Sequence, residues 1–207
     1  MNVVFDWGGT IVKDGDVFAD ICRSSDNFSS SYNGPDSWDS IRSIGNINYF
    51  DSIPNYFYKC LGSLYPDSIR VISRFCGLSQ NDKTKSFILF DNKPSILKEP
   101  KDIIRDISFA FNETNGSVNG FYVNTDKLAF LKSFGADVFV EDDPRIAISL
   151  ANANIKTILL LRKWNSVFTE SSMNCLVSKT KLDKIRNNIF FVEDWLDVEK
   201  TIESFLV

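Results

Sequence analysis

Short apolar runs alternate with stretches of helical periodicity along this chain, and that alternation constrains the fold more than any other feature. The runs are rich in β-branched and aromatic residues, which favours strands. They occupy residues 2–5, 68–73, 136–141, 155–161 and 188–192, with a further candidate at 107–111. Apolar strands separated by helices are typical of a parallel sheet covered on both faces. The sequence therefore predicts an α/β fold, a doubly wound, Rossmann-like parallel sheet.

Four segments carry apolar residues at helical spacing and are predicted to be helices. Three of them start with suitable residues: Pro54 in a first turn, Thr125 as an N-cap, and Pro144 after an acidic turn. The four segments are 49–64, 125–134, 144–153 and 194–205. Residues 85–91 fit either a helix or a strand, so their conformation stays open.

The segment after the first strand departs from this alternation. Residues 14–48 are rich in Ser, Asp and Asn and show weak periodicity. Together with the helix at 49–64 they are interpreted as a small, partly helical cap inserted at residues 14–65. The main domain would then comprise residues 1–13 and 66–207.

The composition excludes several classes of function. None of the 207 residues is a histidine, which removes catalytic histidines and histidine metal ligands. A formal net charge of −4 argues against binding a nucleic-acid duplex through a basic surface. The four cysteines are widely spaced and form no C-x-x-C pair, as expected of free thiols in a cytoplasmic protein. No apolar run reaches the ~20 residues that span a membrane.

Polar residues stand at or near the predicted strand ends. Asp6 follows the first strand, Ser73 and Arg74 end the second, Lys127 opens the helix before the third, and residues 141–143 (Glu-Asp-Asp) end the third. In a doubly wound sheet the carboxyl ends of the strands meet at one crevice. Two carboxylates can hold Mg²⁺ while one of them attacks phosphorus, and a hydroxyl and an ammonium neutralise phosphate oxygens. This set of groups predicts phosphoryl transfer.

The order of these elements resembles the haloacid dehalogenase-like (HAD) superfamily over nearly the whole chain. Phe5-Asp-Trp-Gly-Gly-Thr10 is similar to its first motif, Val71-Ile-Ser-Arg-Phe75 to its second and Phe139-Val-Glu-Asp-Asp-Pro144 to its fourth, with Lys127 in the place of the third. The second half resembles the 5′-nucleotidase-like branch, because the acidic pair is followed by a strand that ends in Trp164-Asn165. We interpret this Trp-Asn pair as a structural turn.

The resemblance implies a role for each matched residue. Asp6 would be the nucleophile that forms an aspartyl-phosphate, and Ser73 and Lys127 would bind phosphoryl oxygens. The implied Mg²⁺ ligands are Asp6, the Gly8 carbonyl and Asp142, with Glu141 or Asp143 in support. The residues assigned to substrate binding are Trp7, Gly9, Thr10 and Arg74. The cap at 14–65 would close over the site and select a small phosphorylated substrate.

Gly8 departs from the superfamily pattern. Phosphatases of this superfamily usually carry a second aspartate there, which protonates the leaving group and later activates water. Three interpretations stay open: a substrate whose leaving group needs little protonation, such as an acyl or aryl phosphate or a phosphonate; an acid from elsewhere, such as Asp14 or Asp16; or loss of turnover. The first two predict a Mg²⁺-dependent phosphatase for a small metabolite such as a nucleotide. The third predicts a catalytically weak protein that binds a phosphorylated ligand or a protein partner.

Overall fold

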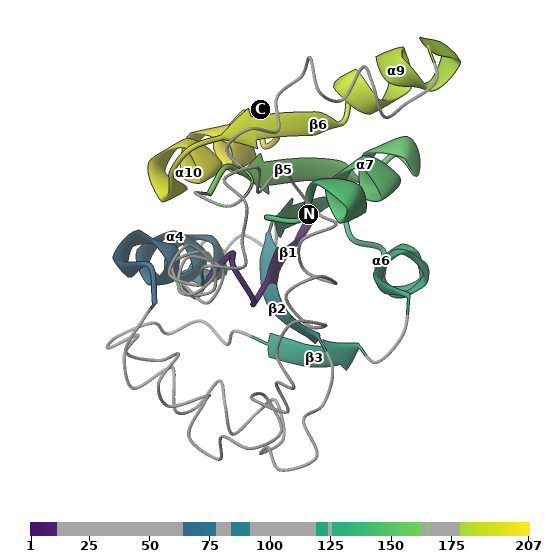
Figure 1. Cartoon of the computed structure of the whole chain (residues 1–207). Coiled ribbons are helices and arrows are strands. Elements are labelled where there is room, and N and C mark those ends of the chain that lie inside the picture. Colours follow the sequence, from purple (N-terminus) through teal and green to yellow (C-terminus); the bar gives the residue numbers. More distant parts are fainter. Residues whose placement is uncertain (12–63, 78–83, 92–118, 124–125, 163–164, 166–178) are drawn as a thin grey trace, which may run out of the picture.

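The computed structural model describes residues 1–11, 64–77, 84–91, 119–123, 126–162, 165 and 179–207. These residues form a six-stranded sheet with helices on both faces (Figure 1). The strands are β1 (Asn2–Asp6), β2 (Lys85–Asp91), β3 (Asn119–Val123), β4 (Val138–Glu141), β5 (Lys156–Leu160) and β6 (Ile189–Val192). All neighbouring strands pair in parallel, which confirms the predicted α/β class.

The strand order gives the sheet a topological switch point. The order is β3-β2-β1-β4-β5-β6, so the chain builds outward from β1 in one direction and then from β4 in the other. The switch point lies between β1 and β4, and open α/β sheets bind ligands beyond the carboxyl ends of their strands at such a point. Asp6 ends β1 and Glu141 ends β4.

Two layers of helices cover the sheet (Figure 1). Helices α4 (Pro66–Gly77) and α10 (Trp195–Ser204) pack on one face, where Phe5 and Val140 belong to the same apolar cluster as Val71 and Val198. Helices α6 (Lys127–Phe134), α7 (Pro144–Asn152) and α9 (Lys179–Arg186) lie on the other face. Successive strand residues point to opposite faces, so both layers of the core come from the same strands. No helix in the described ranges is long and apolar enough to cross a membrane.

Helix α4 shows that the predicted strand at 68–73 is wrong. Val71, Ile72 and Phe75 are buried, whereas Arg70 and Arg74, four residues apart, are exposed. That spacing places the buried residues on one face of a helix. In so short a run of β-branched residues, periodicity alone does not distinguish a helix from a strand. Residues 85–91, which fit either a helix or a strand in the sequence, form strand β2. It is β2 that pairs with β1 in place of the strand predicted at 68–73.

The remaining elements largely follow the predictions. The strands expected at 2–5, 136–141, 155–161 and 188–192 are present as β1, β4, β5 and β6. Helices α7 and α10 begin after the caps Asp143 and Asp194, near the expected starts. Helix α6 is capped by Asp126 rather than Thr125, because its carboxylate accepts hydrogen bonds from the backbone of Leu128 and Ala129. The predicted helix at 49–64, the candidate strand at 107–111 and most of the cap at 14–65 lie outside the described residues.

One ionic cluster joins α4 to α10 and makes stability depend on pH. Glu199 is buried and accepts two hydrogen bonds from Arg70, at 2.9 and 3.2 Å, and one from Arg74. The hydrogen bond from Arg70 holds the pKa of Glu199 below its ordinary value, against burial, which raises it, and Arg74 acts in the same direction as Arg70. A lowered pKa in the folded state contributes stability above the unfolded value and loses it as the pH falls.

We expect Glu199→Gln to lower the free energy of unfolding by about 1–2 kcal/mol at pH 7, because a hydrogen-bonded charge is lost from a buried position. The difference between wild type and variant should shrink as the pH falls below 4.5, the ordinary value for this carboxyl. Urea unfolding at a series of pH values measures both effects. Glu193→Gln, at an exposed position, is the matched control and should leave the unfolding curve unchanged. An equal loss at every pH would contradict the ionic explanation.

Candidate active site

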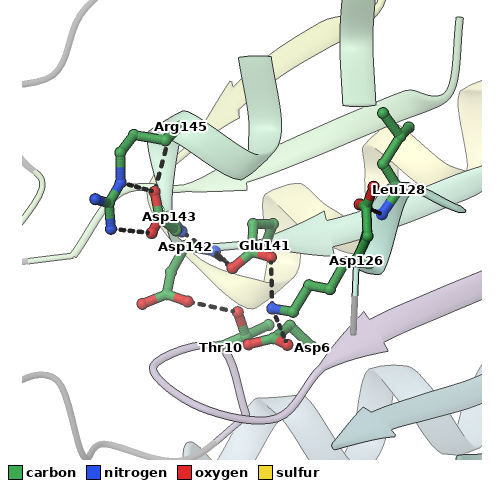
Figure 2. Close-up of polar contacts among 9 residues, drawn as sticks. Asp6, Thr10, Asp126, Leu128, Glu141, Asp142, Asp143 and Arg145 are labelled. Atoms are coloured by element: carbon green, nitrogen blue, oxygen red, sulfur yellow. Dashed lines mark hydrogen bonds and ion pairs between the residues drawn. The ribbon is translucent and has the colours of Figure 1, made fainter. Parts of the chain in front are cut away.

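Three buried carboxylates meet at the carboxyl ends of β1 and β4. Phe5 pairs with Val140, so Asp6 and Glu141 follow at neighbouring positions of adjacent strands. One oxygen from each of Asp6, Glu141 and Asp142 lies within 4.8 Å of the other two. Figure 2 shows these side chains gathered above the turn that follows β1. Buried like charges at this separation need nearby positive charge to stay ionised.

Lys127 supplies one such charge. Its Nζ lies 2.8 Å from Asp6 Oδ1 and 3.1 Å from Glu141 Oε2, the contacts drawn as dashed lines at those two residues in Figure 2. Lys127 is the first residue of α6, so the Asp126 cap that starts the helix also sets the point from which the ammonium reaches the site. The structure therefore brings together Asp6 and Lys127, two of the three residues predicted to be catalytic.

Glu141 and Asp143 have different surroundings. Glu141 Oε1 accepts hydrogen bonds from the backbone of Asp142 (3.0 Å) and Asp143 (3.1 Å), which shapes the turn after β4. Asp143 accepts from the backbone of Arg145 at 2.8 Å as the cap of α7 and pairs with its guanidinium. Of the two supporting residues considered from the sequence, Glu141 is the one in the carboxylate group.

The turn after β1 makes a close approach to Asp142. Gly9 has a φ of +65°, and a Cβ at this position would lie 1.8 Å from Asp142 Oδ2. Thr10 Oγ1 donates a hydrogen bond to Asp142 Oδ1 at 3.1 Å. Gly9 and Thr10 were predicted to bind substrate, and here they shape the position of the Asp142 carboxylate. Trp7 is buried in the apolar cluster under this turn.

Two residues after β5 were not predicted as parts of the site. Arg162 donates from Nε to the Gly9 carbonyl at 3.2 Å and from Nη2 to the Thr10 carbonyl at 2.9 Å. Asn165 Nδ2 donates to the backbone carbonyls of Asp142 (2.6 Å) and Leu160 (2.9 Å). The sequence pattern singles out Trp164-Asn165, but it does not indicate which carbonyls the Asn165 side chain reaches.

Ser73 and Arg74 lose the basis for their predicted roles. Both lie in α4 and not at the end of a strand. Arg74 forms ion pairs with Glu199 and Glu203 of α10. The second motif predicted at residues 71–75 therefore lacks its structural basis, because the strand that it would follow is a helix.

The described donor set fits a hard divalent cation. Carboxylate oxygens are the ligands that Mg²⁺ prefers, and it commonly uses one or two of them together with substrate phosphate oxygens. Asp6 and Asp142 would hold the ion, with Glu141 within reach of the same space. The Gly8 backbone precedes the Gly9–Thr10 turn, so its carbonyl remains a predicted third ligand.

We expect Lys127→Met to destabilise the protein by about 3 kcal/mol at neutral pH, because it leaves buried carboxylates without their ammonium. Added Mg²⁺ should recover part of this loss, since the ion supplies positive charge to the same oxygens. Thermal and urea unfolding with and without Mg²⁺ measure both effects. Lys200→Met, which removes a lysine whose side chain is 73% exposed, should leave the midpoint unchanged. A Lys127 variant as stable as wild type would contradict this account of the site.

The fold is similar to those of solved phosphatases. The crystal structure of D,D-heptose 1,7-bisphosphate phosphatase from Burkholderia thailandensis matches with a TM-score of 0.51, at 14% sequence identity and over 98% of both chains. The same enzyme from B. bronchiseptica, complexed with magnesium and phosphate, matches equally well, with a TM-score of 0.51, 14% identity and 98% of both chains. No protein-family model matches the sequence, and no curated protein matches it significantly. At this identity the likeness establishes a common fold.

Proposed function

We propose that this protein is a Mg²⁺-dependent phosphatase of the HAD-like superfamily that acts on a small phosphorylated metabolite through an aspartyl-phosphate on Asp6. The observation that carries the proposal is the ammonium of Lys127 between Asp6 and Glu141, beside Asp142, at the switch point of the sheet. The similar folds of enzymes named as phosphatases, one of them complexed with magnesium and phosphate, support it.

The proposed reaction has two displacements at phosphorus. An Asp6 carboxylate oxygen forms a bond to phosphorus while the bond to the leaving oxygen breaks, and the electron pair stays with that oxygen. Water then attacks the aspartyl-phosphate, the bond from phosphorus to Asp6 breaks with its electron pair returning to the carboxylate, and inorganic phosphate is released with both protons of the water. Bound Mg²⁺ would supply positive charge to the phosphoryl oxygens. Lys127 would stabilise the same developing charge and hold the Asp6 carboxylate in place.

Gly8 decides which leaving groups suit this site. The leaving oxygen needs a proton unless it is already stable as an anion, and glycine has no group to supply one. Among the described acids, Glu141 is engaged with two backbone N–H groups and Lys127, and Asp143 caps α7. We therefore propose acyl or aryl phosphates as the best substrates. Nucleotides are substrates if Asp14 or Asp16 provides the acid.

Phosphate release measured on a graded set of substrates tests this proposal. The set combines acetyl phosphate, aryl phosphates of decreasing phenol acidity, sugar phosphates and nucleoside monophosphates, each with and without Mg²⁺. Mg²⁺-dependent release that falls steeply as the leaving group becomes less acidic supports a site without a general acid. Comparable rates on nucleotides instead support an acid from elsewhere, which Asp14→Asn and Asp16→Asn would then identify.

The same experiment also tests the alternative function, a catalytically weak protein that binds a phosphorylated ligand or a protein partner. Gly8 is the observation that favours a binding protein, since the superfamily's usual acid is missing. No release from any substrate, combined with a raised melting temperature in the presence of a phosphorylated ligand, would replace the phosphatase proposal with this one. A crystal soaked in Mg²⁺ separately tests the ligands. The ion is expected between Asp6, the Gly8 carbonyl and Asp142, and density elsewhere would contradict that set.

A further inference from the structure

We infer that Arg162 is a positioning residue that holds the turn after β1, and through Thr10 the Asp142 carboxylate, in the arrangement that the metal site requires; this inference rests on the proposed function. Arg162 follows β5 and is 8% exposed. It lies more than 150 residues from its two carbonyl partners in the sequence, separated by 153 and 152 positions. Its contacts link the end of β5 to the turn that follows β1.

The guanidinium fixes two successive peptide groups. Its Nε and Nη2 donate to the carbonyls of Gly9 and Thr10, at 3.2 and 2.9 Å. The same Thr10 whose carbonyl is held donates its hydroxyl to Asp142 Oδ1. Holding the backbone of Thr10 therefore also determines where its hydroxyl presents a proton to the proposed metal ligand.

Asn165 completes the arrangement. Its Oδ1 accepts a hydrogen bond from the backbone N–H of Arg162 at 2.5 Å, and its own N–H donates to the Arg162 carbonyl at 3.1 Å. Its Nδ2 donates to the Asp142 carbonyl. Arg162 and Asn165 thus bind the backbone on both sides of the carboxylate group: Gly9 and Thr10 after β1, and Asp142 after β4.

Tyr65 orients the guanidinium. The Arg162 Cζ lies 3.7 Å from the centre of the Tyr65 ring. The Tyr65 N–H donates to the Ile11 carbonyl, at the end of the turn that follows β1. A ring stacked on its face holds the planar fork in one orientation. Lysine has the same charge but no fork, so it cannot serve two carbonyls from a fixed plane. This difference makes Arg162→Lys an informative substitution.

Amide hydrogen exchange followed by NMR tests the inference without depending on catalysis. The reporter is the Ile11 amide, which closes the turn by donating to the Trp7 carbonyl at 3.1 Å. In Arg162→Lys we expect its exchange to speed up about tenfold or more, as loss of hydrogen bonds from a charged donor implies. Ile202→Val, in the core under α10, is the control for a general loss of stability and should not single out this amide. Unchanged exchange at Ile11 in Arg162→Lys would overturn the inference.

Mg²⁺ binding and turnover give the second readout. Calorimetry with Mg²⁺ alone should show about tenfold weaker binding to Arg162→Lys, because the Asp142 carboxylate is less well held. In an active enzyme kcat should fall while the KM for the phosphorylated substrate changes little. A wild-type protein without turnover would contradict the proposed function. The comparison of Ile11 amide exchange between wild type and Arg162→Lys would still decide the role of Arg162. If Arg162→Lys does not fold, Tyr65→Leu, which removes only the stacked ring, must raise Ile11 exchange for the inference to stand.

Discussion

Phosphate release by Asp6→Asn is expected to fall by about 10³-fold or more in kcat, since the carboxamide keeps the size of the proposed nucleophile but not its reactivity. The change leaves the strand position and backbone of β1 intact. A colorimetric phosphate assay with an aryl phosphate and Mg²⁺ measures the loss. Acid quenching with radiolabelled substrate should trap a phosphorylated protein in the wild type and none in the variant.

The matched control for this substitution is Asp183→Asn. Its side chain is 92% exposed in α9, so the same loss of charge occurs far from the carboxylate group. It should retain wild-type kcat and KM. Near-normal turnover by Asp6→Asn would show that the nucleophile lies elsewhere, whatever the fate of the metal site.

Gly9→Ala is expected to have the largest effect on stability of any single methyl group added to the described turn. The new Cβ would stand 1.8 Å from Asp142 Oδ2 at a φ of +65°, so the carboxylate or the backbone must move. Left-handed strain and overpacking together imply a loss of about 3 kcal/mol. Displacing Asp142 should also remove the stabilisation by Mg²⁺. Urea unfolding with and without Mg²⁺ measures both effects.

The chain offers a close control for this change. Gly135, at the end of α6, also has a positive φ, +74°, but a Cβ there meets nothing within 4 Å. Gly135→Ala should therefore show the backbone strain alone, about 1 kcal/mol, with the Mg²⁺ effect intact. Equal losses in the two variants would mean that the approach of Gly9 to Asp142 has no energetic consequence.

The fold was predicted where local pattern and packing agree. β1, β4 and β5 are central strands buried on both faces, so their apolar runs are nearly continuous and recognisable. β3, which the sequence did not predict, is an edge strand and begins with Asn and Gly, which disfavour strands. Helix α9 has only two buried apolar residues, Leu182 and Ile185, among mostly charged ones, which is too weak a pattern to identify it.

Within the described residues, the largest error is at helix α4. Its β-branched residues favour a strand locally, and only packing against the sheet and α10 selects the helix. The consequence reached the site, because Ser73 and Arg74 had been placed at a strand end that does not exist. Asp6, Lys127 and Asp142 do come together in the structure, because each stands directly beside an element that the sequence predicts well.

The sequence by itself determined the α/β class, the residues at the ends of β1 and β4, and the glycine at position 8, because these follow from local patterns along the chain. Only the tertiary structure decided how the groups meet. Lys127 bridges two carboxylates, Gly9 makes room for Asp142, and Arg162 reaches the turn after β1. Such contacts depend on strand order and register, which are set by packing of the whole sheet and leave no local trace in the chain.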